Sequence, residues 1–182
     1  MKTIVLLLAF ITLAGCKPWL EVHTDYDPDH DQWTYTTFNW GIPDSTVIRN
    51  PLYYSELNDK RIKAAVQKQL LKRGYQITND NPQLLLQYHI VVEDKTAIAT
   101  EPLGYAYGPY WTRTDRQAYT YTEGTLILDL TDTHIRQLVW RGWAASAVDG
   151  VDSPAQIERL IDLAVRKMFD EFPKRKYKNM KP

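Results

Sequence analysis

The order of hydrophobic and polar residues predicts six β-strands, because apolar and polar side chains alternate with a two-residue period in six segments. The predicted strands are residues 19–25, 33–40, 75–78, 84–94, 118–132 and 136–148. The segment that starts at Leu84 is the strongest, with one stripe made by Leu86, Tyr88, Ile90 and Val92. The first two segments flank a short acidic turn, so we expect them to pair as a hairpin.

Two other segments show the helical period. The first follows Ser55, an N-cap residue type, and ends before Gly74, a residue type that closes helix C-termini. Its predicted apolar face consists of Leu57, Ile62, Ala65, Val66 and Leu70. The second follows Ser153, has Pro154 at its first position, and ends before Pro173, with Gln156 completing a capping box. Its apolar stripe consists of Ile157, Leu160, Ile161, Ala164, Val165, Met168, Phe169 and Phe172.

The predicted order is strand, strand, helix, four strands, helix. Two helices with one apolar stripe each cannot cover both faces of a sheet this wide. We therefore expect an α+β fold, with a mainly antiparallel sheet of about six strands and both helices packed on one face. The opposite face would then contact water or a partner.

The N-terminal segment has the layout of a secretory signal peptide. Lys2 precedes an uninterrupted apolar run from Ile4 to Leu13, which is about half the length that a membrane-spanning helix needs. A buried N-terminal helix is the alternative, but the run has no polar face. We expect residues 1–15 to be cleaved, leaving residues 16–182 as one α+β domain with a basic tail at 174–182. That tail either contacts anionic headgroups or is a solvated terminus.

The single cysteine, Cys16, directly follows Leu13-Ala14-Gly15. This stretch resembles the lipobox of bacterial lipoproteins. The resemblance implies a diacylglyceryl thioether on the sulfur, cleavage before Cys16, and acylation of the new amino group with a fatty acid such as palmitate. In such lipoproteins an aspartate directly after the cysteine causes retention in the inner membrane. This chain has Lys17 at that position, so the resemblance implies sorting to the outer membrane. The domain would face the periplasm, and the acyl chains on Cys16 would attach it to the membrane.

Composition excludes several functional classes. The chain has 22 basic and 22 acidic residues, so no global field favours nucleic acid. One cysteine cannot form an internal disulfide. The sequence lacks a G-x-S-x-G motif and a glycine-rich phosphate loop. We therefore expect no enzymatic activity, no catalytic residues and no cofactor.

Two weak metal patterns remain open. The turn with Asp25, Asp27, Asp29, His30 and Asp31 resembles the start of a calcium loop, but an EF-hand would need glycine at its sixth and glutamate at its twelfth position. The alternative is a turn whose aspartates cap backbone amides. His23 and His89 would be zinc ligands only if their strands brought them together. We expect no metal site.

The segment 103–116 is the best candidate binding surface. Gly104, Gly108 and Pro109 alternate with aromatic residues in what we expect to be a loop from Glu101 to Thr114. The candidate contact residues are Tyr105, Tyr107, Tyr110, Trp111 and Arg113, with Arg116 following. Exposed rings stack on sugars, peptides or lipid headgroups. The alternative is that these rings fold back over the open face of the sheet.

Several blocks together resemble a known family: Tyr35-Thr36-Thr37-Phe38-Asn39-Trp40, Asn50-Pro51-Leu52, Leu71-Lys72-Arg73-Gly74-Tyr75, Pro82-Gln83-Leu84-Leu85-Leu86, Gly124-Thr125-Leu126-Ile127-Leu128-Asp129-Leu130 and Leu138-Val139-Trp140-Arg141-Gly142. The chain is similar to the DUF4136 family of small Gram-negative envelope lipoproteins, a domain of unknown function. The resemblance implies no catalytic or binding residues. We expect a non-enzymatic module that binds an envelope protein or glycan or maintains the envelope; the alternative is a ligand carrier or enzyme with a cleft beside segment 103–116.

Overall fold

The computed structural model of the chain describes residues 19–28, 35–41, 55–102 and 114–173. Six strands and two helices follow one another in the expected order. They are β1 (Glu21–Tyr26), β2 (Thr37–Trp40), α2 (Glu56–Lys72), β3 (Gln76–Ile77), β4 (Leu84–Pro102), β5 (Thr114–Asp132), β6 (Leu138–Ala147) and α3 (Pro154–Asp170). Within these residues, no helix has the length and apolar character that a membrane crossing requires.

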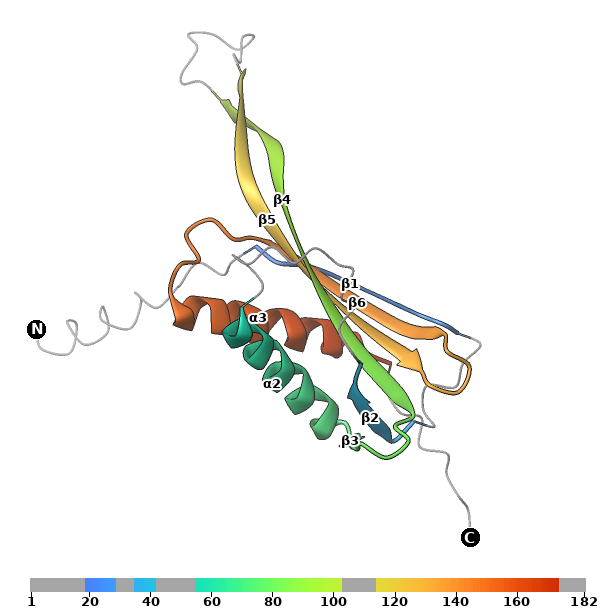
Figure 1. Ribbon diagram of the computed structural model, residues 1–182. Helices are drawn as coiled ribbons and strands as arrows, with labels where there is room; N and C mark the ends of the chain where they lie inside the picture. The colour runs from blue at the N-terminus through green and yellow to red at the C-terminus, as the bar shows by residue number, and fades with distance from the viewer. Residues whose placement is uncertain (1–18, 29–34, 42–54, 103–113, 174–182) are drawn as a thin grey trace, which may run out of the picture.

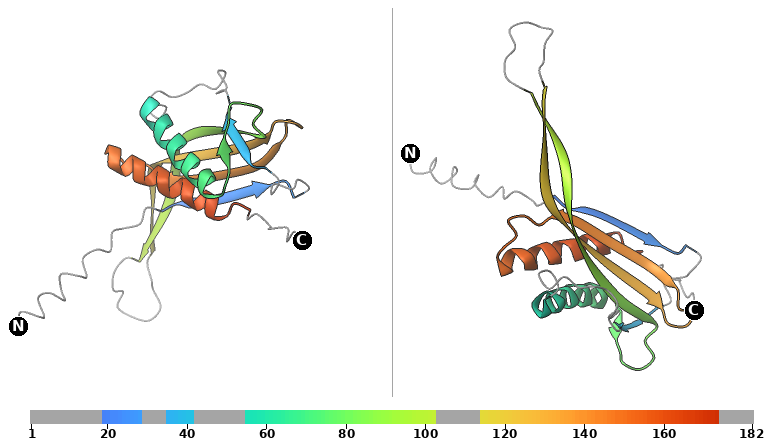
Figure 2. Two further views of the ribbon diagram at one scale, coloured as in Figure 1. Left: turned by 90° about the horizontal axis from the view of Figure 1, so that it is seen from below. Right: turned by 45° about the horizontal axis from the view of Figure 1, so that its top comes forward.

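The strands form one open sheet in the order β1-β6-β5-β4-β2-β3. The β1–β6, β6–β5 and β5–β4 pairs are antiparallel, whereas β2 runs parallel to both β4 and β3. Both helices lie side by side on the same face of the sheet (Figures 1 and 2). The predicted α+β class, with a mainly antiparallel sheet and helices on one face, is confirmed.

The predicted hairpin of the first two strands is wrong. β1 pairs with β6, with Glu21 opposite Ala145. Three strands separate β1 from β2, which pairs with β4, with Phe38 opposite Leu84. Local alternation identifies a strand but does not determine which strand it pairs with. Here the burial of the β2 side chains determines the pairing. Phe38 has no exposed surface in this position, because it lies beneath the helices in the common core.

The helix ends follow the predicted capping chemistry. The Ser55 hydroxyl accepts a bond from the Asn58 N–H (3.1 Å), and Ser153 and Gln156 form the expected capping box. Gly74 closes α2 in the left-handed region with φ +81°. Leu57, however, is 61% exposed, because five residues at 100° per residue place it about 140° around the helix from buried Ile62.

The core lies between the helices and the centre of the sheet. The Trp140 ring, from β6, is 1% exposed and contacts the rings of Phe169 and Phe172 at centroid distances of 5.4 and 5.1 Å. The Arg73 guanidinium joins the two helices at their C-terminal ends, since it donates to the Phe169 carbonyl and to the Gln69 side chain. These contacts hold the two helices together at their C-terminal ends.

Candidate functional site

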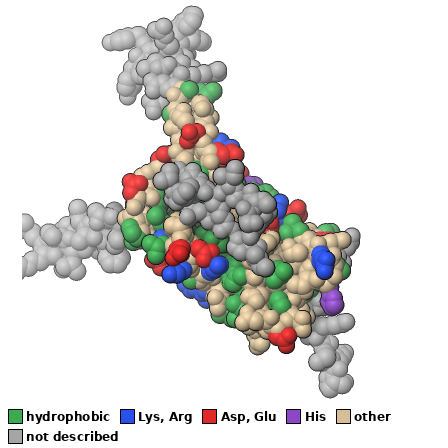
Figure 3. All heavy atoms as spheres, in the orientation of Figure 1, with side chains coloured by type: hydrophobic (Ala, Val, Ile, Leu, Met, Phe, Trp, Pro, Cys, Tyr) green, Lys and Arg blue, Asp and Glu red, His purple; other side chains and the backbone are tan. Residues whose placement is uncertain are grey.

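β4 and β5 continue well beyond the rest of the sheet. The last row shared with β6 joins Glu123 to Ala147, and beyond it nine residue pairs follow, from Asp94↔Thr122 to Pro102↔Thr114. This two-stranded ribbon, residues 94–102 and 114–122, is called the arm. Nine residues at 3.4 Å per residue span about 30 Å. Figures 1 and 3 show the arm projecting from the body.

Polar contacts fix the base of the arm. The Lys95 ammonium lies 2.8 Å from a Glu93 carboxylate oxygen and 3.9 Å from one of Glu123, and its hydrogen bond with Glu93 raises the pKa of Lys95. The Thr122 N–H donates to the Asp149 carboxylate (2.7 Å), and the Val148 N–H donates to the Thr122 carbonyl (2.9 Å). The loop after β6 therefore sets the direction in which the arm leaves the sheet.

The two ends of the predicted aromatic loop coincide closely with the ends of the two strands of the arm. Strand pairing continues to Pro102 and resumes at Thr114, so the predicted loop boundaries of Glu101 and Thr114 are each nearly correct. The structure assigns Arg116 to β5, because the ladder extends further than composition indicates. The candidate contact residues Tyr105, Tyr107, Tyr110, Trp111 and Arg113 lie outside the described residues.

A cavity of about 420 Å³ lies at the base of the arm, between the sheet and the N-terminal ends of both helices. Apolar side chains form most of its wall, among them Leu20, Ile62, Ile90, Leu126 and Ile161. Polar groups of Asn58, Thr122, Asp149 and Asp152 also line it. A volume of this size, with an apolar wall and few polar groups, suits a small apolar ligand.

Sequence reasoning missed this cavity. It lies at the level of Val92 and Gly124, ten ladder positions or about 34 Å from Pro102 and Thr114, where the described part of the arm ends. Gly124 is the one available signal, since a glycine within a strand often marks a close approach. A Cβ at this position would lie 2.8 Å from the Val148 side chain.

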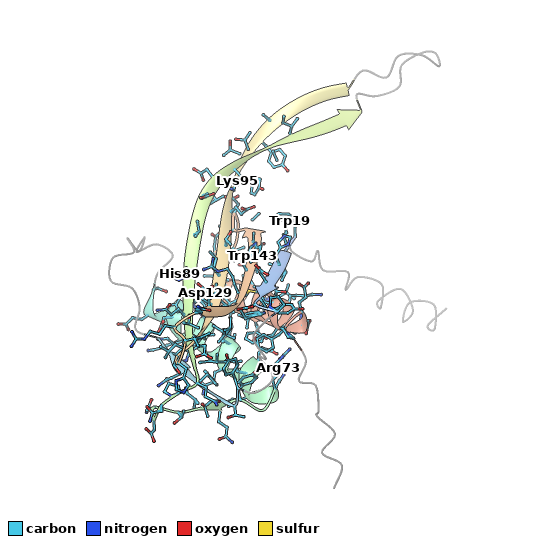
Figure 4. All side chains as sticks on the ribbon, turned by 90° about the vertical axis from the view of Figure 1, so that its right-hand side faces the viewer. Trp19, Arg73, His89, Lys95, Asp129 and Trp143 are labelled. Carbon is cyan, nitrogen blue, oxygen red and sulfur yellow. The ribbon has the colours of Figure 1, made fainter. Side chains whose placement is uncertain are left out.

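The face of the sheet opposite the helices carries a paired polar cluster. The Arg141 guanidinium donates twice to the Asp129 carboxylate (2.6 and 2.7 Å), and His89 Nε2 lies 3.8 Å from the same carboxylate. Figure 4 shows His89 and Asp129 side by side on this face. Because the carboxylate is buried and already holds a bidentate partner, it serves the sheet as an ion pair rather than as a free base.

The histidines do not converge. His23 stacks on Trp143, with ring centroids 5.2 Å apart, and belongs to the same row as His89 but at its other end. Three inter-strand steps, about 14 Å, separate the two histidines. In residues 19–28, 35–41, 55–102 and 114–173, no three His, Cys, Asp or Glu side chains gather to hold a metal ion. Asp29, His30 and Asp31 of the acidic turn lie outside these ranges.

The buried Ser146, in β6, has a structural role. Its hydroxyl donates to the Trp19 carbonyl at 2.7 Å, which ties the segment before β1 to β6. Trp19 therefore lies at the end of the sheet from which the arm departs, close to Trp143 in Figure 4. Cys16, three residues earlier, lies outside the described residues.

Asp132 organises the turn between β5 and β6. Its carboxylate accepts the Tyr35 hydroxyl (2.5 Å) and the backbone N–H groups of His134 (2.6 Å) and Ile135 (3.1 Å). Burial opposes the charged form, but these bonds together lower the pKa of Asp132 below its usual value of 3.8. Its stabilising effect is therefore present above pH 4 and is lost as the pH falls through this lowered pKa.

Asp132→Asn is expected to lower the free energy of unfolding at pH 7 by about 1–3 kcal/mol, because the charged acceptor of two backbone N–H groups is lost. Urea unfolding at pH 7 and pH 3 measures the effect. The difference between wild type and variant should shrink at pH 3, because this pH lies below the usual carboxyl pKa of 3.8 that applies in the unfolded chain. Exposed Asp152→Asn is the control, and an equal Asp132→Asn effect at both pH values would contradict the assignment.

Comparisons with solved structures identify the fold. A PDZ domain protein from Parabacteroides distasonis aligns over 97% of this chain with 15% identity and a TM-score of 0.56. The chain spans only 41% of that protein's length, and the likeness at this identity concerns the fold alone. Two PelC dodecamer structures from Paraburkholderia phytofirmans align over 87% of this chain and all of theirs, with 12% and 10% identity and TM-scores of 0.44.

The family comparison covers most of the sequence. No curated protein matches the chain. The model described as "Domain of unknown function (DUF4136)" matches residues 22–174, from the start of β1 to just past α3. The match includes every described strand and both helices. The chain therefore belongs to the DUF4136 family.

Proposed function

We propose that the chain is a lipoprotein of the outer membrane, anchored through acyl chains on Cys16, with a non-enzymatic periplasmic domain that binds an envelope protein or glycan. The apolar run before Cys16 and the small residues Ala14 and Gly15 support the anchor. Several acyl chains at one residue give durable attachment, since each buried CH₂ contributes about 0.8 kcal/mol.

The position of Trp19 supports contact close to the membrane. Cys16 is three positions before Trp19 in the chain, a reach of at most about 11 Å. Trp19 lies at the same end of the sheet as the base of the arm. Aromatic residues are favourable near lipid headgroups, and the sequence of segment 103–113, which joins the two strands of the arm, is rich in them.

The arm is the observation that carries the binding role. A two-stranded ribbon is at best marginally stable by itself, and this ribbon receives no packing from either helix along most of its length. Ile98 is 68% and Tyr119 53% exposed on it. Large apolar side chains on a projecting element are more useful for contact with a partner than for stability.

The combined substitution Tyr107→Ala, Tyr110→Ala and Trp111→Ala tests this role. The melting temperature should stay within about 2 °C of wild type, because none of the three residues belongs to the core that the described residues form. Photo-crosslinking from position 105 in native membranes should lose its specific protein or glycan products. Tyr26→Ala, Leu71→Ala and Leu138→Ala, which alter exposed residues of the body, form the matched control.

Two results would contradict the proposal. Unchanged crosslinks in the triple variant would remove the aromatic segment from the binding role. A large fall in melting temperature would instead favour the view that these rings cover the open face of the sheet. Both readings come from the same pair of samples, so neither depends on knowing the partner beforehand.

A second candidate function is the carriage of an apolar ligand in the cavity at the base of the arm. A fluorescent fatty acid added to the purified protein should then bind, and Ile161→Trp, which fills part of the cavity, should raise its Kd about tenfold. Ile135→Trp is the control, because Ile135 is exposed and absent from the cavity wall. Equal binding by both variants would exclude the cavity as the site.

A further inference from the structure

The arm leaves one edge of β4 unpaired in the described part of the chain. β2 pairs with β4 only from Phe38↔Leu84 to Trp40↔Leu86. Beyond Leu86, the only described strand that pairs with β4 is β5, on the opposite side. An edge with free N–H and C=O groups is a template for another strand.

Even-numbered residues of β4 direct their backbone groups to this edge. The Leu86 carbonyl accepts the Gly41 N–H on the β2 side (2.8 Å), whereas the Gln83 carbonyl accepts the Thr133 N–H on the β5 side (3.1 Å). Because these directions alternate along a strand, Thr96, Ile98 and Thr100 present donor and acceptor pairs at the free edge.

The edge lacks protection at its centre. Natural edges are blunted by charges, proline or bulges, but residues 96–100, Thr-Ala-Ile-Ala-Thr, contain none of these. Ile98, in the middle, is the most exposed of the large apolar side chains in the described residues. Charged residues flank this stretch, with Lys95 before it and Glu101 after it.

This sequence is complementary to itself. If the β4 edges of two copies run antiparallel about Ile98, each Ile98 faces its counterpart and Thr96 faces Thr100 of the other copy. Lys95 then stands opposite Glu101 on the same face, and this pair occurs twice. Pairing about Ala97 would instead oppose Glu93 and Glu101, which repel each other.

Lys95 remains available for this contact. Its side chain is 43% exposed, and its two present neighbours, Glu93 and Glu123, are both in its own chain. An ammonium group has three donors, so one more carboxylate can bind without displacing Glu93. Figure 4 shows Lys95 on the arm, away from the helices.

The geometry points to a homodimer in which the β4 edges of two copies pair antiparallel about Ile98. The arms then form a continuous four-stranded ribbon with about six new backbone hydrogen bonds, and the two bodies lie at its opposite ends. Four strands are stable where two are marginal. This inference names a partner for the arm proposed above as a binding element, but it requires neither the lipid anchor nor the aromatic segment.

Disulfide trapping tests the two-fold axis. Ile98→Cys places two thiols opposite each other, with Cα atoms about 5.5 Å apart, within the range that a disulfide allows. The full-length variant in native membranes should run as a crosslinked dimer on a non-reducing gel. Thr96→Cys is the matched control, since its two thiols would be about 14 Å apart along the strand. The parent protein, which carries Cys16, shows any background from an unmodified thiol.

Charge reversal tests the register. Lys95→Glu and Glu101→Lys, each alone, should raise the Kd of the purified full-length dimer roughly tenfold, because two attractive pairs become repulsive. The double variant restores both pairs and should return the Kd to near the wild-type value. Sedimentation in a density-matched detergent measures all four proteins.

A dimer trapped by Ile98→Cys and the recovery of the double variant would support the inference. Equal trapping by Thr96→Cys, trapping to a protein of another mass, or a double variant no tighter than the singles would overturn it. A dimer that forms while the parent shows a free Cys16 thiol would support the pairing and contradict only the lipid anchor, so the two failures are distinguishable.

Discussion

Trp140→Ala is expected to lower the free energy of unfolding by about 3–5 kcal/mol, a large part of the stability of a domain of this size. The ring is 1% exposed and contacts two other aromatic rings, so its removal leaves a cavity that the helices cannot fill without moving. Guanidinium unfolding should show a lower midpoint with an unchanged slope.

Trp140→Phe is the matched control, and its expected cost is smaller. The indole N–H of Trp140 is buried without a hydrogen-bond partner in the described part of the chain, so its loss partly offsets the lost contacts. A cost below about 1 kcal/mol for Trp140→Ala would mean that the core packs differently.

Cys16→Ser is expected to release the protein from the membrane into the soluble periplasmic fraction. A serine hydroxyl cannot replace the thiolate that takes the lipid, and the acyl chains are the membrane anchor proposed for this protein. Fractionation after a high-salt wash, followed by immunoblotting, measures the shift. Nearly all of the wild-type protein should stay with the membranes, and nearly all of the variant should leave them.

Lys17→Asp separates anchoring from sorting. This variant should remain in the membrane fraction but move to the inner membrane on a sucrose gradient, because the lipid is retained and only the residue after it has changed. If Cys16→Ser stays with the membranes after the wash, another part of the chain holds it there, and the basic tail at 174–182 becomes the first segment to remove.

Local chemistry in the sequence was sufficient for the helices and for most strand positions. The helix ends depend on hydrogen bonds between residues close in sequence, so they can be predicted without tertiary information. Examples are the capping box of Ser153 with Gln156 and the glycine at position 74, directly after Arg73. The partner of each strand cannot be predicted from local sequence in this way. β1 and β2 alternate equally well, yet the buried position of Phe38 beside Leu84 places β2 next to β4, with three strands between it and β1.

The candidate sites also combine features that local sequence predicts with features that depend on tertiary structure. Residues 95–102 and 114–117 extend the strands predicted at 84–94 and 118–132, because pairing between β4 and β5 continues as far as Pro102↔Thr114, further than composition indicates. The cavity depends on how far the starts of α2 and α3 stand from β4 and β5, a distance that no single segment encodes. Leu20 and Ile161, which share its wall, are 141 positions apart in the chain.

The mass of the intact mature protein, purified from membranes of its native host, tests the central claim most directly. The account predicts a chain that begins at Cys16, with a diacylglyceryl group on the sulfur and a third acyl chain on the amino group. A chain that retains residues 1–15, or one that begins at Cys16 with a bare thiol, would contradict the anchor and the envelope role proposed from it.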